Sequence, residues 1–133
     1  MTRAKLRVIY GDTDQMGVVY HANYLRFFEA ARNEYFRDRG GSYREIEREG
    51  FQLPVVEARV KYKAPARYDD LVEVEVGLGE VRRATFTFNY ILRREGEDRI
   101  LATGETVHAC LDTNGRPVRI PDRLLQQLRT DPA

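Results

Sequence analysis

One segment of this chain carries a long helical pattern of apolar residues, and nearly every apolar segment after it alternates with a period of two. The helical stripe, from Tyr20 onward, is formed by residues spaced mainly by three and four: Tyr24, Leu25, Phe27, Phe28, Ala31, Tyr35 and Phe36. This spacing predicts a helix of about four turns whose broad apolar face a sheet can cover. Gly40 and Gly41 supply its end.

Alternating segments elsewhere predict strands. The first runs from Arg3 to Tyr10, with every second residue apolar, which is typical of a half-buried strand. Four more segments alternate at about residues 56–63, 72–78, 85–92 and 99–111. Two connections are short, one from Gly79 to Arg83 and one around Glu95 to Asp98, and such short links between neighbouring strands predict antiparallel hairpins.

Two shorter helices complete the expected order of elements. Ser42 and Glu45 have the spacing of a capping box, which predicts a short helix ending near Gly50. A tail helix is expected to start at Pro121 and Asp122, because proline is accepted in a first helical turn. One long helix beside an antiparallel sheet predicts an α+β fold, and we expect residues 1–133 to form a single domain.

Charge and composition narrow the class of partner. Lys and Arg total 22 against 21 Asp and Glu, a net charge of +1, so bulk charge gives no reason to expect nucleic acid or an anionic membrane. Cys110 is the only cysteine, which excludes an intramolecular disulfide and fits a reducing compartment. The sequence shows no signal peptide and no apolar run of the ~20 residues that a membrane span needs. A cytoplasmic protein is therefore expected.

Residues 10–21, which read YGDTDQMGVVYH, form the segment where chemistry can be argued. They contain two acids, two glycines and the first histidine, between the first strand and the long helix. Free N–H groups at a helix start can hold a developing oxyanion, while a carboxylate attacks a substrate or activates water. The positive end of the helix dipole also favours an ionised acid.

Other interpretations of this segment compete. Asp12 and Asp14 can each simply cap a turn. An Asp-x-Asp pair also occurs in aspartate-dependent phosphatases, but the strand-only second half argues against their parallel sheet. A calcium loop counted from Asp12 has Met16 at its fifth position and Asn23 at its twelfth, where a carboxylate is expected.

The histidines, the cysteine and the lysines outside this segment predict no metal site and no second functional site. His21, His108 and Cys110 lack the spacing of zinc ligands, and we expect no metal and no cofactor. His108 and Cys110 are expected to pack in the last strand. Lys61 and Lys63 are expected on a solvated face.

Residues 10–32, YGDTDQMGVVYHANYLRFFEAAR, resemble the N-terminal signature of the 4-hydroxybenzoyl-CoA thioesterase family, closest to its Tol-Pal-associated acyl-CoA thioesterase branch. The similarity extends through residues 58–76, ARVKYKAPARYDDLVEVEV, and 81–88, VRRATFTF. The resemblance implies the hot-dog fold, in which a curved antiparallel sheet wraps one long helix. It also implies homodimers or homotetramers with active sites at the subunit interface.

The resemblance assigns roles to five residues. It implies that Asp14 is the catalytic acid, as nucleophile or general base, and that the helix start near Tyr20 and His21 polarises the thioester carbonyl. The amide of His21 is the implied oxyanion donor, in a position where the founding enzyme has tyrosine. Arg82 and Arg83 resemble the segment that contacts the nucleotide end of CoA. Without the resemblance, these two arginines fit a solvated turn equally well.

The resulting prediction is an acyl-CoA thioesterase that releases a free carboxylate and CoA. Two alternatives remain: a hot-dog hydratase or dehydratase, and a non-catalytic acyl-CoA-binding or scaffold protein of the same fold. Glu29 is the main rival base, and its competing role is an ion pair with Arg26 or Arg32 on the same helical face.

Overall fold

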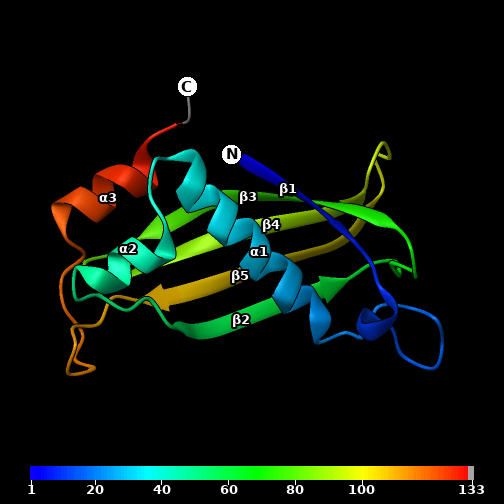
Figure 1. The fold of residues 1–133 in the computed structure, drawn as a ribbon, viewed down its shortest axis with the longest axis horizontal. Helices are drawn as coiled ribbons and strands as arrows, with labels where there is room; N and C mark the ends of the chain where they lie inside the picture. Colours follow the sequence, from blue (N-terminus) through cyan, green and yellow to red (C-terminus); the bar gives the residue numbers. More distant parts are fainter. Residues whose placement is uncertain (132–133) are drawn as a thin grey trace.

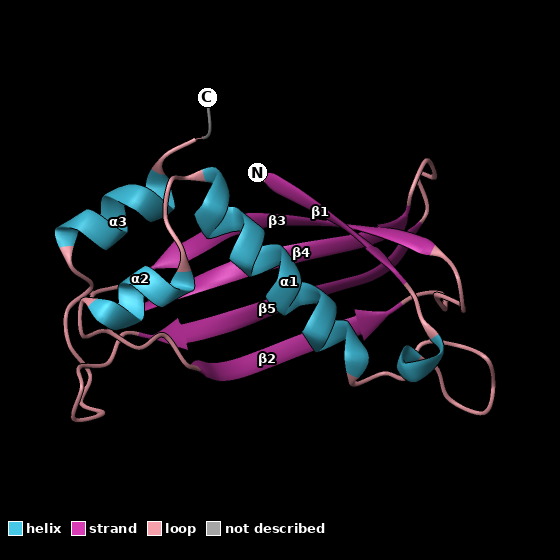
Figure 2. Cartoon of the chain, viewed as in Figure 1, coloured by secondary structure: helices cyan, strands magenta, loops and turns pink. Residues whose placement is uncertain are grey.

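A five-stranded antiparallel sheet packs against one long helix in the computed structural model, which describes residues 1–131 (Figure 1 and Figure 2). The elements follow in the order β1 (Thr2–Arg7), η1 (Tyr10–Asp12), α1 (Asn23–Asp38), α2 (Tyr43–Arg48), β2 (Val55–Tyr62), β3 (Leu71–Val81), β4 (Thr85–Arg94), β5 (Ile100–Ala109) and α3 (Asp122–Arg129). The α+β architecture predicted from the periodicity is confirmed.

The strands lie in the order β1-β3-β4-β5-β2, and all four pairings are antiparallel. β1 and β2 are therefore the two edges. The register places Val55, His108 and Phe86 in one row near one end of the sheet. Tyr62 and Leu92 share another row through Ala102, toward the opposite end.

The core lies between α1 and one face of the sheet (Figure 1). Six of the seven residues of the predicted stripe are buried, whereas Leu25 is half-exposed at 38%. The Phe28 ring stacks on Tyr90 with centroids 4.3 Å apart. Gly104 lies directly beneath this ring, where a Cβ atom would meet Phe28 and would lie 2.8 Å from the Arg59 carbonyl oxygen. The helix can approach β5 closely because this position has no side chain.

Two of the predicted boundaries near the helix start are wrong. The first strand ends at Arg7 instead of Tyr10, because the chain turns into η1 and leaves the Tyr10 side chain 75% exposed. The long helix begins at Asn23, after a turn in which the Asn23 N–H donates to the Tyr20 carbonyl at 2.9 Å. His21 therefore lies in the turn that precedes the helix.

Both short helices form near the expected positions. The Ser42 hydroxyl accepts the Glu45 N–H at 3.2 Å, so the first half of the predicted capping box is present. The long helix ends as expected, with Gly40 at a φ of 77°, a backbone conformation that glycine adopts without strain. α3 begins directly after Pro121.

β2 is the strand whose surroundings differ most from the expectation. Its alternation suggests a buried apolar face, yet Val56 is 58% exposed and Tyr62 is 50% exposed. β2 is an edge strand, and α1 has more close backbone contacts with β1 and β3 than with β2, so much of the surface of this strand is left exposed.

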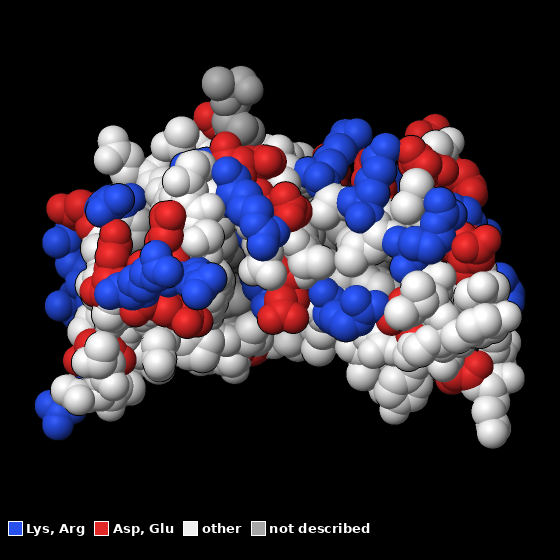
Figure 3. All heavy atoms as spheres, in the orientation of Figure 1, with Lys and Arg blue, Asp and Glu red and all other residues white. Residues whose placement is uncertain are grey.

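The surface carries interspersed charges of both signs over the face drawn in Figure 3. The lower right of that view, which holds η1 and the loop after it, is largely uncharged. Four exposed apolar side chains come from this part of the chain: Ile9, Tyr10, Met16 and Tyr20. No helix within residues 1–131 combines the length and hydropathy that crossing a membrane requires.

Candidate active site

A tight turn between β1 and α1 positions the first candidate acid. Thr13 pairs with Val19 in an isolated antiparallel bridge, and the Asp14 N–H donates to the Val18 carbonyl at 2.9 Å. Gly17, with a φ of 77°, allows the chain to reverse between them. Asp14 is thereby held beside Val18.

Asp14 is half-buried, and only one of its two carboxylate oxygens accepts a hydrogen bond within the described chain. Its Oδ1 accepts the Met16 N–H at 2.9 Å, so the turn-capping role considered for this acid is real. Its other oxygen accepts no hydrogen bond from residues 1–131. Capping and chemistry are therefore compatible, because the two roles use different oxygens.

Asp12 has a structural role. Its side chain is buried, with one oxygen accepting the Ile9 N–H at 3.0 Å and the other paired with Arg26. Its carbonyl accepts the Tyr20 N–H at 2.8 Å and the Asn23 side-chain amide at 2.9 Å. These bonds fasten the loop to the helix start, and they leave this carboxylate no free oxygen.

The backbone before α1 offers unoccupied donors. The N–H groups of His21 and Ala22 have no backbone or side-chain acceptor within residues 1–131. No side chain caps the helix, whose N-cap is Ala22. Such N–H groups can bind an anion or a developing oxyanion.

A pocket of about 290 Å³ opens beside these donors. Val18, Val19, His21, Tyr24, Tyr62, Lys63, Ala64 and Pro65 line it. The Tyr62 hydroxyl donates to the His21 carbonyl at 2.7 Å and so ties the end of β2 to the helix start. Burial raises the pKa of both Tyr24 and Tyr62, so both phenols stay protonated near neutral pH. We name this site the His21 pocket.

Sequence reasoning missed five residues of the His21 pocket: Tyr24, Tyr62, Lys63, Ala64 and Pro65. Tyr24 was predicted as part of the core stripe, Tyr62 as part of an apolar strand face, and Lys63 as solvated. No local pattern distinguishes them, because they meet only through the packing of β2 against the helix start. Tyr20 itself does not line the pocket; its ring is exposed and lies against the His21 ring at 4.3 Å.

Glu29 lies apart from the His21 pocket, on an exposed part of α1. The expected ion pair with Arg26 or Arg32 is wrong. Arg26 reaches back to Asp12, and Arg32 turns inward to donate to the Tyr90 hydroxyl at 3.2 Å. Glu29 forms no ion pair with any residue of the described chain.

Arg82 and Arg83 lie at the opposite end of the sheet from Asp14. The loop that holds Asp14 adjoins the start of β3, where the Val8 N–H donates to the Asp70 carbonyl at 2.9 Å. The arginines follow the end of β3 (Figure 1). Because a strand rises about 3.3 Å per residue, the two ends of β3 are roughly 30 Å apart. One chain therefore does not bring these arginines to Asp14.

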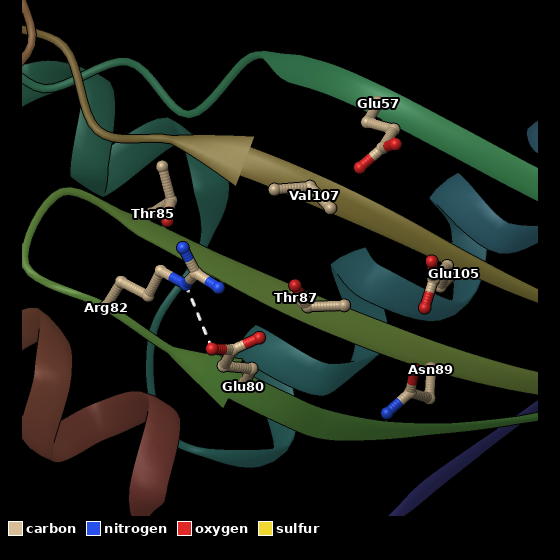
Figure 4. Close-up of a pocket in the computed structure, with 8 residues that line it drawn as sticks. All are labelled: Glu57, Glu80, Arg82, Thr85, Thr87, Asn89, Glu105 and Val107. Atoms are coloured by element: carbon tan, nitrogen blue, oxygen red, sulfur yellow. Dashed lines mark hydrogen bonds and ion pairs between the residues drawn. The ribbon is translucent and has the colours of Figure 1, made fainter.

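Arg82 reaches over the sheet face that points away from α1. There it pairs with Glu80 at 2.9 Å and borders a polar depression of about 500 Å³ (Figure 4). The depression is lined by Glu57, Glu80, Arg82, Thr85, Thr87, Asn89, Glu105 and Val107. Arg83 is exposed, and its carbonyl accepts the Ile120 N–H at 2.9 Å.

His108 and Cys110 pack in the core, as predicted. His108 stacks on Phe86 with ring centroids 5.2 Å apart. Burial lowers the pKa of His108 to about 4, so it is neutral at physiological pH. Residues 1–131 contain no group of three or more His, Cys, Asp or Glu side chains arranged to hold a metal ion.

One long helix against a five-stranded antiparallel sheet is the hot-dog fold, and a solved 4-hydroxybenzoyl CoA thioesterase shares it with a TM-score of 0.85 at 24% identity, over 95% of this chain and 96% of that one. A hypothetical protein from Aquifex aeolicus superposes with a TM-score of 0.90 and 38% identity, over 96% of this chain and 98% of that one. A hypothetical protein from Thermus thermophilus gives the same TM-score and identity, over 96% of this chain and 97% of its own.

Sequence comparison defines the family. The thioesterase-like superfamily model matches residues 8–128. The acyl-CoA thioesterase YbgC of Haemophilus influenzae is 39% identical over 119 residues, which cover 87% of this chain and 85% of that protein. The chain belongs to the thioesterase-like superfamily, and the resemblance inferred from its residues is confirmed.

Proposed function

We propose that this protein hydrolyses acyl-CoA thioesters to a free carboxylate and CoA, and that Asp14 carries the reaction. The observation that carries the proposal is the turn at residues 13–19. Its backbone hydrogen bond joins Asp14 to Val18, the Asp14 carboxylate keeps one unoccupied oxygen, and Val18 and His21 line the same pocket. The names of relatives such as the acyl-CoA thioesterase YbgC support the substrate class.

In the proposed mechanism, the thioester carbonyl lies in the His21 pocket with its oxygen toward the free N–H groups of His21 and Ala22. Asp14 attacks the carbonyl carbon and expels the CoA thiolate, and water hydrolyses the resulting mixed anhydride. In the general-base version, Asp14 takes a proton from the water that attacks this carbon. In both versions charge develops on the carbonyl oxygen, where the backbone donors stabilise it.

A second copy of the chain completes this proposal. The outer edge of β2 pairs with no strand of residues 1–131, and exposed apolar side chains flank it. If two copies pair antiparallel along β2, a two-fold axis places Tyr62 of each near Val55 of the other. Val55 shares the end of the sheet from which Arg82 and Arg83 project, so each pair of arginines would then lie at the same end of the assembly as the Asp14 of the other copy.

The test compares Asp14→Asn with the wild type for thiol release from acyl-CoAs of graded length. We expect kcat to fall by about a hundredfold or more, because the amide neither attacks nor accepts a proton. Asp98→Asn, in the exposed β4–β5 loop, is the matched control and should keep full activity. Equal rates for Asp14→Asn and wild type would refute the role of Asp14. Binding of acyl-CoA without thiol release would identify a non-catalytic binder instead.

A further inference from the structure

A hollow of about 420 Å³ lies between α1, α2 and the start of β2, separate from the His21 pocket. Its polar lining comes from Glu29, Arg32 and Asn33 on α1 and from Tyr43 and Glu47 on α2. Val55, the first residue of β2, forms part of its rim. We name it the Arg32 hollow.

Arg32 is the unusual residue of this hollow. The residue is only 9% exposed, yet the one hydrogen-bond partner of its side chain within residues 1–131 is the neutral Tyr90 hydroxyl at 3.2 Å. A buried guanidinium without a carboxylate is costly, and it carries five N–H donors. Every fully buried side-chain nitrogen and oxygen of the described chain has a partner. The Arg32 nitrogens without a partner are therefore not fully buried, and Arg32 is one of the residues that line the hollow.

The charges around the hollow select the kind of group that fits there. Glu29 and Glu47 line it without pairing with Arg32, so its net charge is negative and a carboxylate is disfavoured. Burial raises the pKa of Tyr43 to about 12, which keeps that phenol neutral. A hydroxyl group suits this mixture, since it can accept from a guanidinium and donate to a carboxylate.

The location of the hollow connects it to the reaction. The Arg32 hollow adjoins Val55 at the start of β2, and the His21 pocket adjoins Tyr62 at its end. Two copies paired antiparallel along β2 bring the hollow of one beside the His21 pocket of the other. This step rests on the function proposed above.

We propose that the Arg32 hollow receives the distal end of an acyl group whose thioester lies in the neighbouring copy's His21 pocket. Arg32 is then a specificity-determining residue, which donates to an oxygen on that distal end. The substrate class that follows is acyl-CoA with a hydroxyl near the far end of the acyl group. Plain hydrocarbon chains and chains ending in a carboxylate should be poorer substrates.

The test uses three acyl-CoAs that differ only at the distal end: hexanoyl-CoA, 6-hydroxyhexanoyl-CoA and adipoyl-CoA, with their shorter and longer homologues. Wild-type protein should show the highest kcat/KM for the hydroxyl form. Arg32→Gln should lower that value by about tenfold or more, the scale of a lost hydrogen bond to a charged donor. Hydrolysis of hexanoyl-CoA should change little. Arg48→Gln on the exposed side of α2 is the control.

A second variant keeps the test decisive if Arg32→Gln does not fold. Glu47→Gln removes one negative charge from an exposed residue of the hollow, and it should raise kcat/KM for adipoyl-CoA selectively. Misfolding cannot produce such a gain. Equal kcat/KM for the three wild-type substrates, or no selective gain in Glu47→Gln, overturns the role of the hollow while leaving thioester hydrolysis intact. Failure of the wild type to release thiol from any acyl-CoA overturns the proposed function itself.

Discussion

A chain of hydrogen bonds crosses the core from Arg32 to the backbone of Leu53. Arg32 donates to Tyr90 Oη, which lies 2.6 Å from Thr106 Oγ1. Thr106 Oγ1 lies 2.8 Å from His108 Nε2, and His108 Nδ1 lies 3.0 Å from the Leu53 carbonyl oxygen. A carbonyl only accepts, so Nδ1 carries the proton and Nε2 accepts from Thr106. The chain is fully satisfied only while the imidazole is neutral.

This dependence predicts a loss of stability in acid. The folded-state pKa of His108 is about 4, below the ordinary value of 6.5, because burial disfavours the cation. The unfolded chain therefore takes up the proton first as the pH falls. The contribution of His108 is complete above pH 6.5 and is lost between pH 6.5 and 4. At ~1.4 kcal/mol per pKa unit it amounts to about 3 kcal/mol.

Urea unfolding of the wild type and His108→Asn at a series of pH values measures this contribution. Carboxylates titrate in both proteins, so the informative quantity is the difference between their free energies of unfolding. That difference should shrink between pH 6.5 and 4, because asparagine does not titrate. A difference that stays constant across this range would show that the histidine is not held neutral.

Asp12 and Asp14 show how much the sequence predicts about the role of a single residue. The sequence predicts that residues 10–21 carry chemistry, and the resemblance favours Asp14 over Asp12. The hydrogen-bond partners of each carboxylate cannot be predicted from the sequence, because Arg26 and the Ile9 N–H contact Asp12 only after the loop folds onto α1. The same limit explains the wrong pairing expected for Glu29.

At the scale of elements, the contact between α1 and β5 depends on Gly104. A Cβ atom there would collide with Phe28 and approach the Arg59 carbonyl to 2.8 Å. Gly104→Ala should therefore push the Phe28 ring from Tyr90 and lower the free energy of unfolding by about 1–3 kcal/mol, the usual cost of overpacking a core. The measurement is urea unfolding.

Gly11→Ala is the matched control for this prediction. Its Cβ would meet no heavy atom of residues 1–131 within 4 Å, so stability should stay within about 0.5 kcal/mol, as at most surface positions. If Gly104→Ala were as stable as this control, the helix would have room that the structure does not show.

The order and type of the elements were predictable because local patterns determine them. Helical spacing, period-two alternation and the glycines after α1 all act within a few residues. The exposure of β2 was not predictable, since its alternation is that of a half-buried strand and its cover depends on where α1 lies. The His21 pocket was missed for the same reason: Tyr24 and Tyr62 are 38 positions apart in the sequence.

At the scale of the whole molecule, Asp14 and the arginines of the β3–β4 turn are at opposite ends of one sheet. The proposed pairing along β2 resolves this separation, because it joins the Asp14 end of one copy to the Arg82 end of the other. A shared site of this kind predicts that two defective chains can complement each other. One chain would carry Asp14→Asn, and the other would carry Arg82→Ala together with Arg83→Ala.

Each variant alone should be defective at both of its sites, the first in kcat and the second in KM for acyl-CoA. A mixed pair contains one site in which Asp14 and both arginines are intact. If the chains combine at random, half of the pairs are mixed and half of their sites are whole, so co-expressed and differently tagged chains should recover about a quarter of wild-type activity. Purification through both tags isolates the mixed pairs, and their activity should approach half of the wild-type value. Mixed pairs no more active than either parent would show that Asp14 and the arginines do not serve one shared site.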